Sequence, residues 1–145
     1  MAAPSGGKPT PAQVRRKIDR LDLARINRKA ITEYRWRPAR AREAELWYRN
    51  FLWLCYKNRS PVAAIGKDAD DFWHLHILDT RKYAADCKKV FGRFLEHRPL
   101  YGPPGPKERN LFTRTQALYI SEFGATPRLL KVRSWSVGQK GSPSA

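Results

Sequence analysis

Residues 68–99 read DADDFWHLHILDTRKYAADCKKVFGRFLEHRP and carry most of the chain's chemically distinctive side chains. They include all three histidines of the protein and one of its two cysteines: His74, His76, His97 and Cys87. From Trp73 to Phe91, apolar and aromatic side chains recur every three or four positions, which is the spacing of one face of an α-helix. The pattern predicts a helix of about five turns that ends near Gly92.

The remainder of the chain shows the same helical spacing. Apolar side chains recur in this way over residues 14–34, 38–56 and 108–123, and residues 38–56 have the widest apolar face. No segment alternates apolar and polar residues over the length of a strand. The sequence therefore predicts an all-α fold, a small bundle of about four helices with disordered termini.

Composition predicts the domain organisation. Residues 1–11 are rich in Pro, Gly and Ser and are expected to be a disordered basic tail, residues 12–130 a single helical domain, and residues 131–145 a second disordered tail. The apolar runs are too short for a membrane span, and the opening segment lacks the apolar centre of a secretory signal. With two cysteines no disulfide framework is expected, so the sequence favours a cytoplasmic location.

The charge is large and unevenly distributed. The chain has 29 Lys and Arg against 13 Asp and Glu, a net charge of +16, and residues 1–60 hold fifteen of the basic residues against five acidic ones. Such a field attracts nucleic acid or an acidic protein surface, and it can equally be a solvated outer face. The basic side chains that we expect to contact a polyanion are Arg15, Arg16, Arg20, Arg28, Arg35, Arg37, Arg40, Arg42 and Arg49. No helix-turn-helix, RRM or zinc-finger signature accompanies them, which predicts sequence-tolerant binding to the phosphate backbone.

The histidines and Cys87 are also candidate metal ligands, because imidazole and thiolate groups are preferred by zinc and iron. The candidate set is His74, His76, Cys87 and His97. On a helix, His74 and His76 lie about 200° apart around the axis and face opposite ways. His76 and Cys87 share a face, but about 16 Å of continuous helix separates them. The spacing therefore opposes a single ion held by all four side chains.

The helical spacing favours a buried polar seam instead, in which the ring nitrogens of His76 are bonded by groups from neighbouring helices. The residues of this seam are Trp73, His76, Asp79, Thr80, Tyr83 and Cys87. A third interpretation makes Cys87 a nucleophile with His97 or His76 as its base. A cysteine on an apolar stripe is usually buried and inert, which weighs against that interpretation.

The motif itself is D-x-x-W-H-x-H-I-L-D-T-x-x-Y-x-x-D-C, from Asp70 to Cys87, and the pattern continues to His97 and Pro99. It resembles the glycine-rich domain-containing protein-like family, and the similarity covers about residues 17–125. The glycine-rich extension of the plant members is absent, and Glu96 stands where the family has a second histidine. The resemblance implies a helical fold and locates the site within this motif, and it implies no particular reaction.

The function expected from the sequence is a basic helical binding module that docks onto nucleic acid or an acidic partner without a cofactor. In that hypothesis the His/Cys motif is a structural polar seam. The alternative is a transition-metal-binding protein or metalloenzyme that holds zinc or iron through the motif. The sequence leaves open whether the protein is an enzyme.

Overall fold

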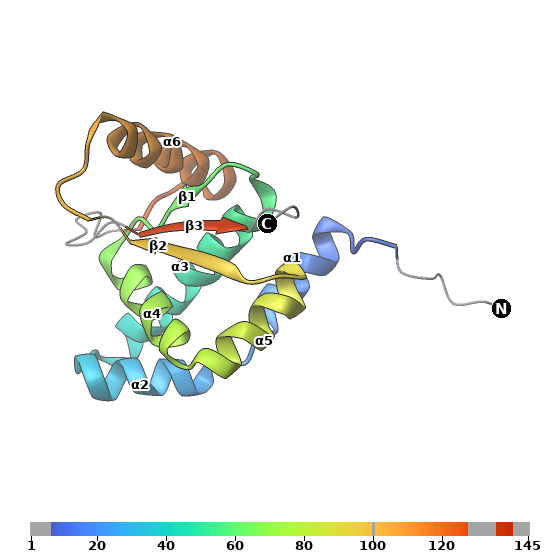
Figure 1. Ribbon diagram of the computed structural model, residues 1–145. Helices are drawn as coiled ribbons and strands as arrows, with labels where there is room; N and C mark the ends of the chain where they lie inside the picture. Colours follow the sequence, from blue (N-terminus) through green and yellow to red (C-terminus); the bar gives the residue numbers. More distant parts are fainter. Residues whose placement is uncertain (1–6, 100, 128–135, 141–145) are drawn as a thin grey trace.

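The computed structural model describes residues 7–99, 101–127 and 136–140, and within them the chain forms six helices and three short strands (Figure 1). In chain order these are α1 (Pro11–Asp19), α2 (Ala24–Tyr34), α3 (Pro38–Lys57), β1 (Val62–Ala63), α4 (Lys67–Leu78), α5 (Thr80–Phe91), β2 (Leu95–Pro99), α6 (Pro106–Phe123) and β3 (Ser136–Lys140). The mostly helical architecture confirms the predicted fold class in its broad form. None of the helices in these ranges combines the length and apolar character needed to cross a bilayer.

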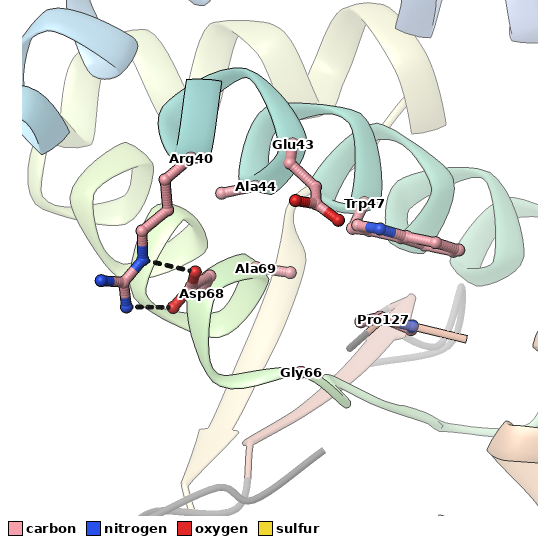
Figure 2. Close-up of a pocket in the computed structure, with 8 residues that line it drawn as sticks. All are labelled: Arg40, Glu43, Ala44, Trp47, Gly66, Asp68, Ala69 and Pro127. Atoms are coloured by element: carbon pink, nitrogen blue, oxygen red, sulfur yellow. Dashed lines mark hydrogen bonds and ion pairs between the residues drawn. The ribbon is translucent and has the colours of Figure 1, made fainter. Parts of the chain in front are cut away.

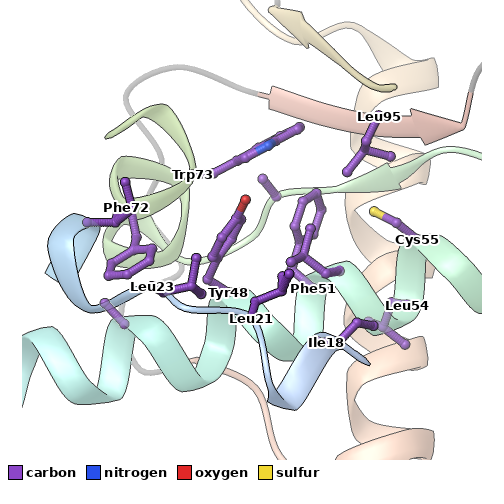
Figure 3. Packing of buried hydrophobic residues seen from close by; sticks show 14 of the residues in the cluster. Ile18, Leu21, Leu23, Tyr48, Phe51, Leu54, Cys55, Phe72, Trp73 and Leu95 are labelled. Atoms are coloured by element: carbon purple, nitrogen blue, oxygen red, sulfur yellow. The ribbon is translucent and has the colours of Figure 1, made fainter. Parts of the chain in front are cut away.

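The longest helix, α3, lies at the centre of the hydrophobic core. It buries Tyr48, Phe51, Leu54 and Cys55, and helices α1, α2 and α4 pack around it (Figure 3). This central position follows from the wide apolar face expected over residues 38–56, because a helix with such a face can be covered by other helices on several sides. Within the described residues, α1, α2, α4, β1 and β3 all contact this helix.

The prediction of about four helices is wrong, because two predicted helices are each divided. The first breaks between α1 and α2, where Leu21 and Leu23 are buried and Asp22 accepts a hydrogen bond from the Ala24 amide at 3.1 Å. The second breaks at Asp79, whose ψ of 72° ends α4 and starts α5 in a new direction. Apolar spacing continues across both breaks, so periodicity alone predicts one helix where there are two.

The small sheet was not expected from the sequence. Its strand order is β1-β3-β2, with both pairs antiparallel, so the strand nearest the C-terminus lies in the middle. Gly138 is paired with Val62 on one side and with His97 on the other. The strands have two to five residues and pair across long sequence separations, which leaves no local pattern to detect. Strand β3 lies within residues 131–145, where we expected a disordered tail; the other residues of that stretch lie outside the described ranges.

Gly138 is buried where β3 crosses helix α3. A Cβ atom at this position would lie 2.6 Å from Cζ of Phe51 and 2.7 Å from Sγ of Cys55. Real Cβ atoms do not approach other atoms this closely, so the strand docks on α3 only because this residue has no side chain.

Replacing Gly138 by alanine should therefore destabilise the protein. Alanine in place of glycine normally stabilises a strand by about 0.5–1 kcal/mol, whereas overpacking a core costs about 1–3 kcal/mol. We expect the overpacking to dominate and the free energy of unfolding, measured in urea, to fall. Gly7→Ala is the control, since nothing lies within 4 Å of its added Cβ. An unchanged or increased stability in Gly138→Ala would contradict the docking of β3 on α3.

Candidate functional site

Helix α4 directs its two histidines to opposite sides, as their spacing requires. His76 is 1% exposed and faces the core, whereas the His74 side chain is 33% exposed and faces strand β2. The two residues therefore belong to separate polar groups. One group is a buried network around His76, and the other is a cluster beside β2.

The ring of His76 is bonded at both nitrogens. Its Nδ1 lies 2.6 Å from the hydroxyl of Tyr48 on α3, and its Nε2 lies 2.8 Å from Oδ2 of Asp86 on α5. Because a carboxylate can only accept, Nε2 carries the proton, and Nδ1 accepts from the Tyr48 hydroxyl. Lys82 forms an ion pair with the same Asp86 oxygen at 2.9 Å. The network thus joins three helices and ends in a charged pair.

A second set of buried bonds is formed around Tyr83. Nε1 of Trp73 donates to the Tyr83 hydroxyl at 3.1 Å, and that hydroxyl donates to the backbone carbonyl of Leu95 at 2.6 Å. Cys87 is 3% exposed in the same region, and burial raises the pKa of its thiol despite hydrogen bonds with Leu95 and Tyr83. A buried cysteine that holds its proton is a poor nucleophile. The burial of Cys87 therefore gives no support to the interpretation in which it is a nucleophile with His97 or His76 as its base.

The structure brings together four of the six predicted seam residues, namely Trp73, His76, Tyr83 and Cys87. Asp79 instead pairs with Arg25 of α2 at 2.8 Å, and Thr80 is exposed at the start of α5. Both lie at the break between α4 and α5, and a continuous helix was the basis for including them. Sequence reasoning missed Tyr48 and Asp86. Asp86 lies three residues after Tyr83, so helical spacing could have indicated it.

The cluster beside β2 contains Asp70, His74 and His97. Nε2 of His74 lies 2.8 Å from Nε2 of His97 and 3.7 Å from Oδ1 of Asp70. One ligand atom from each of the three residues lies within 4.8 Å of the other two. Asp70 is 3% exposed and the two histidines are partly buried, so the group is set into the surface.

Regular secondary structure positions all three side chains. Asp70 and His74 are four residues apart on α4 and so share one face of the helix. On β2, Leu95 is buried and Glu96 is exposed, so strand alternation turns His97 back towards the protein. The ring of Trp73 packs against His97 at 4.6 Å between centroids. The three side chains of the cluster are therefore held by a helix and a strand, and none of them is on a loop.

The electrostatics of the cluster favour neutral imidazoles. Burial lowers the pKa of His74, and nearby Asp71 offsets this only in part. Burial and the proximity of His74 together lower the pKa of His97. A neutral imidazole has the lone pair that a metal ion requires. The direct bond between the two Nε2 atoms means that one of them carries a proton, which must move to Nδ1 before both can bind an ion.

Of the four predicted metal ligands, the structure places His74 and His97 together and His76 and Cys87 elsewhere. The two dispersed residues belong to the buried hydrogen-bond networks. Asp70 was missed as a ligand, although its spacing from His74 is the signal that could have found it. The break at Asp79 removes the continuous helix that was expected to hold His76 and Cys87 apart, but both ring nitrogens of His76 are bonded to Tyr48 and Asp86.

The predicted polyanion-binding arginines divide into two groups. Three are engaged within the fold: Arg15 bonds Asp19 and Asn50, Arg40 bonds Asp68, and Arg49 bonds Glu45 and the backbone carbonyls of Ile18 and Leu21. The other six are exposed, and these are Arg16, Arg20, Arg28, Arg35, Arg37 and Arg42.

A separate cavity of about 200 Å³ lies between the first turns of α3 and α4 (Figure 2). Trp47 and Pro127 form part of its wall, and Glu43 points towards Trp47. Asp68 at its edge is held by two hydrogen bonds from Arg40, at 2.8 and 2.9 Å. The cavity has walls of mixed charge and contains none of the histidines.

The buried Asp86 should make stability depend on acid pH. Burial alone would raise the pKa of Asp86, but hydrogen bonds from His76 and Lys82 reverse this, and its pKa is lowered overall. Such a group stabilises the fold above its unfolded pKa of about 3.9, and this contribution disappears as the pH falls through the folded pKa. Asp86→Asn should be less stable than the unmodified protein at neutral pH. Its free energy of unfolding should fall by less than that of the unmodified protein when the pH is lowered.

Urea unfolding from about pH 7 to about pH 3 measures this difference. Glu96→Gln, at an exposed position on β2, serves as the control and should follow the unmodified protein. Identical pH dependence in Asp86→Asn and the unmodified protein would show that Asp86 contributes no such stability.

Comparison with known proteins gives one match. No curated protein and no solved structure matches the chain. A family model described as UCP032817-like matches residues 16–114, a stretch that contains the buried networks and the Asp70, His74 and His97 cluster. Because this match extends over more than half of the chain, the protein belongs to the UCP032817-like family.

Proposed function

We propose that this protein binds one divalent transition-metal ion, zinc or iron, through Asp70, His74 and His97. The observation that carries the proposal is the convergence of the three side chains from two elements. The two Nε2 atoms are 2.8 Å apart, and the carboxylate oxygen is 3.7 Å from that of His74. Two imidazoles and one carboxylate without a thiolate form a ligand set used by zinc and by non-haem iron.

The separations are close to those that a bound ion requires. Zinc–ligand bonds of about 2.0–2.1 Å place tetrahedral ligand atoms about 3.3 Å apart. The nitrogen pair would therefore open by about half an ångström, and the carboxylate would move inward.

Three protein ligands leave at least one coordination position for water or another molecule. The His74 side chain is 33% exposed, which puts that position on the solvent side of the cluster. An ion with an open position can act as a Lewis acid, whereas structural zinc sites are closed by four protein ligands. We assign metal binding and no reaction.

The resemblance to the glycine-rich domain-containing protein-like family supports the same location. Its central pattern begins at Asp70, contains His74 and continues to His97. The buried network around His76 has the role of scaffold in this proposal, because both of its ring nitrogens are already bonded.

The exposed arginines favour a second function, docking onto a polyanion. Six of the nine arginines that the sequence indicated are exposed on α1 and just after it, on α2, in the turn between α2 and α3, and on α3. A chain with a net charge of +16 attracts nucleic acid or an acidic surface over a distance. This function uses none of the cluster residues, so both functions can belong to one protein.

Metal titration tests the first proposal. Isothermal titration of metal-free protein with Zn²⁺ or Co²⁺ should give one site per chain. His74→Gln, His97→Gln and Asp70→Asn keep the side-chain size but remove a ligand, and each should weaken binding at least about a hundredfold. At metal concentrations of about 100 times Kd, the unmodified protein should gain about 2.7 kcal/mol of stability.

Glu96→Gln is the matched control, since Glu96 is next to His97 in sequence and its side chain is exposed on β2, outside the cluster. This control should bind metal as the unmodified protein does. Absence of stoichiometric binding, or binding that the three ligand variants leave unchanged, would contradict the proposal.

A further inference from the structure

The stretch from Arg28 to Arg42 carries an unusual concentration of exposed positive charge. Its exposed cationic side chains, which we call the basic corner, are Arg28, Lys29, Arg35, Arg37 and Arg42. Within the described ranges none of them forms an ion pair, and the only other charged residues of the stretch are Glu33 and Arg40. The fold therefore leaves this charge available to a partner.

The turn at Arg35 joins α2, whose middle carries Arg28 and Lys29, to the start of α3, which carries Arg42. Arg35 itself has a left-handed conformation, with φ of 54°, and this ends α2 and turns the chain into α3. Trp36 is 5% exposed and anchors the turn in the core. The guanidinium of Arg40 lies 4.9 Å from the Trp36 ring centroid and is bonded to Asp68, so it braces the turn. Arg35 and Arg37, on either side of Trp36, remain exposed.

An aromatic ring lies within the basic corner. Tyr34 is 38% exposed, and its ring centroid is 5.2 Å from that of Trp36. The Tyr34 hydroxyl donates to the backbone carbonyl of Asp71, and Arg35 follows the ring in sequence. A partly exposed ring held against a buried ring can stack with a base while nearby arginines contact phosphates.

We propose that the basic corner binds single-stranded nucleic acid, with phosphates on its arginines and a base against Tyr34. The inference rests on the polyanion-docking function and gives that function a location and a partner. Contacts to phosphate make the binding sequence-tolerant and strongly dependent on salt. One residue at the turn, Tyr34, supplies the preference for unpaired bases over duplex.

The test uses full-length protein and a fluorescent oligouridine of about twelve nucleotides, a length within the usual range of such sites. Anisotropy gives Kd for the unmodified protein and for the triple variant Arg35→Glu, Arg37→Glu, Arg42→Glu. The matched control reverses three exposed charges on α5, namely Arg81, Lys88 and Lys89, and so changes the net charge equally. Helix α5 begins beside the N-terminal end of α2, where Arg25 pairs with Asp79 (Figure 1). Arg35, Arg37 and Arg42 follow the opposite, C-terminal end of α2 in the chain.

The corner variant should weaken binding at least about tenfold more than the α5 variant at the same salt concentration. Tyr34→Leu should weaken it about fivefold or more, whereas Tyr34→Phe, which keeps the ring, should bind as the unmodified protein does. A duplex of the same length should bind less tightly than the single strand.

Equal losses in the two triple variants would overturn the basic corner as the site while leaving polyanion docking in place. Tighter binding of polyglutamate than of oligouridine would overturn nucleic acid as the partner. Binding of neither polymer at low salt would overturn both the inference and the docking function beneath it. Near-ultraviolet circular dichroism of each variant shows that a loss of binding is not a loss of fold.

Discussion

The buried hydroxyl of Tyr83 holds the region around both polar groups together. It accepts from Trp73 of α4 and donates to the carbonyl of Leu95 on β2, so one oxygen atom links α4, α5 and β2. Leaving such buried groups without partners would cost about 1–3 kcal/mol each, which makes the arrangement mutually dependent. Because β2 is held against α4 at Leu95, His97, two residues further along the strand, lies beside His74. The position of His97 in the candidate metal cluster therefore depends on the hydrogen bond between Tyr83 and Leu95, which lies outside the cluster.

Helix α4 separates two kinds of polar chemistry. On its core side, His76 is bonded at both nitrogens and the network closes on Asp86 and Lys82. On its β2 side, three potential ligand atoms converge and His74 is partly exposed. The first arrangement fixes how α3, α4 and α5 pack, since every member has a partner. Only the second can exchange ligands with solvent, and for this reason we assign metal binding to it.

The sequence predicted the helices from their apolar spacing but not where they break. It correctly indicated that His74 and His76 face opposite ways, because this follows from the geometry of any helix. It could not show that His97 would reach His74, since that contact depends on β2, on its pairing with β3, and on the absence of a side chain at Gly138. Asp70 was within reach of sequence reasoning, at four residues from His74. Tyr48 was not, because its bond to His76 arises only when α3 packs on α4.

The most direct test of the central claim is an anomalous diffraction experiment at the zinc absorption edge on crystals of the zinc-loaded protein. We expect one strong peak within about 2.0–2.2 Å of Oδ1 of Asp70 and of Nε2 of both His74 and His97. A structure without a peak there, in which the two histidines keep their direct hydrogen bond in the presence of zinc, would contradict it. In that case the cluster would be, like the network around His76, a structural contact between a helix and a strand.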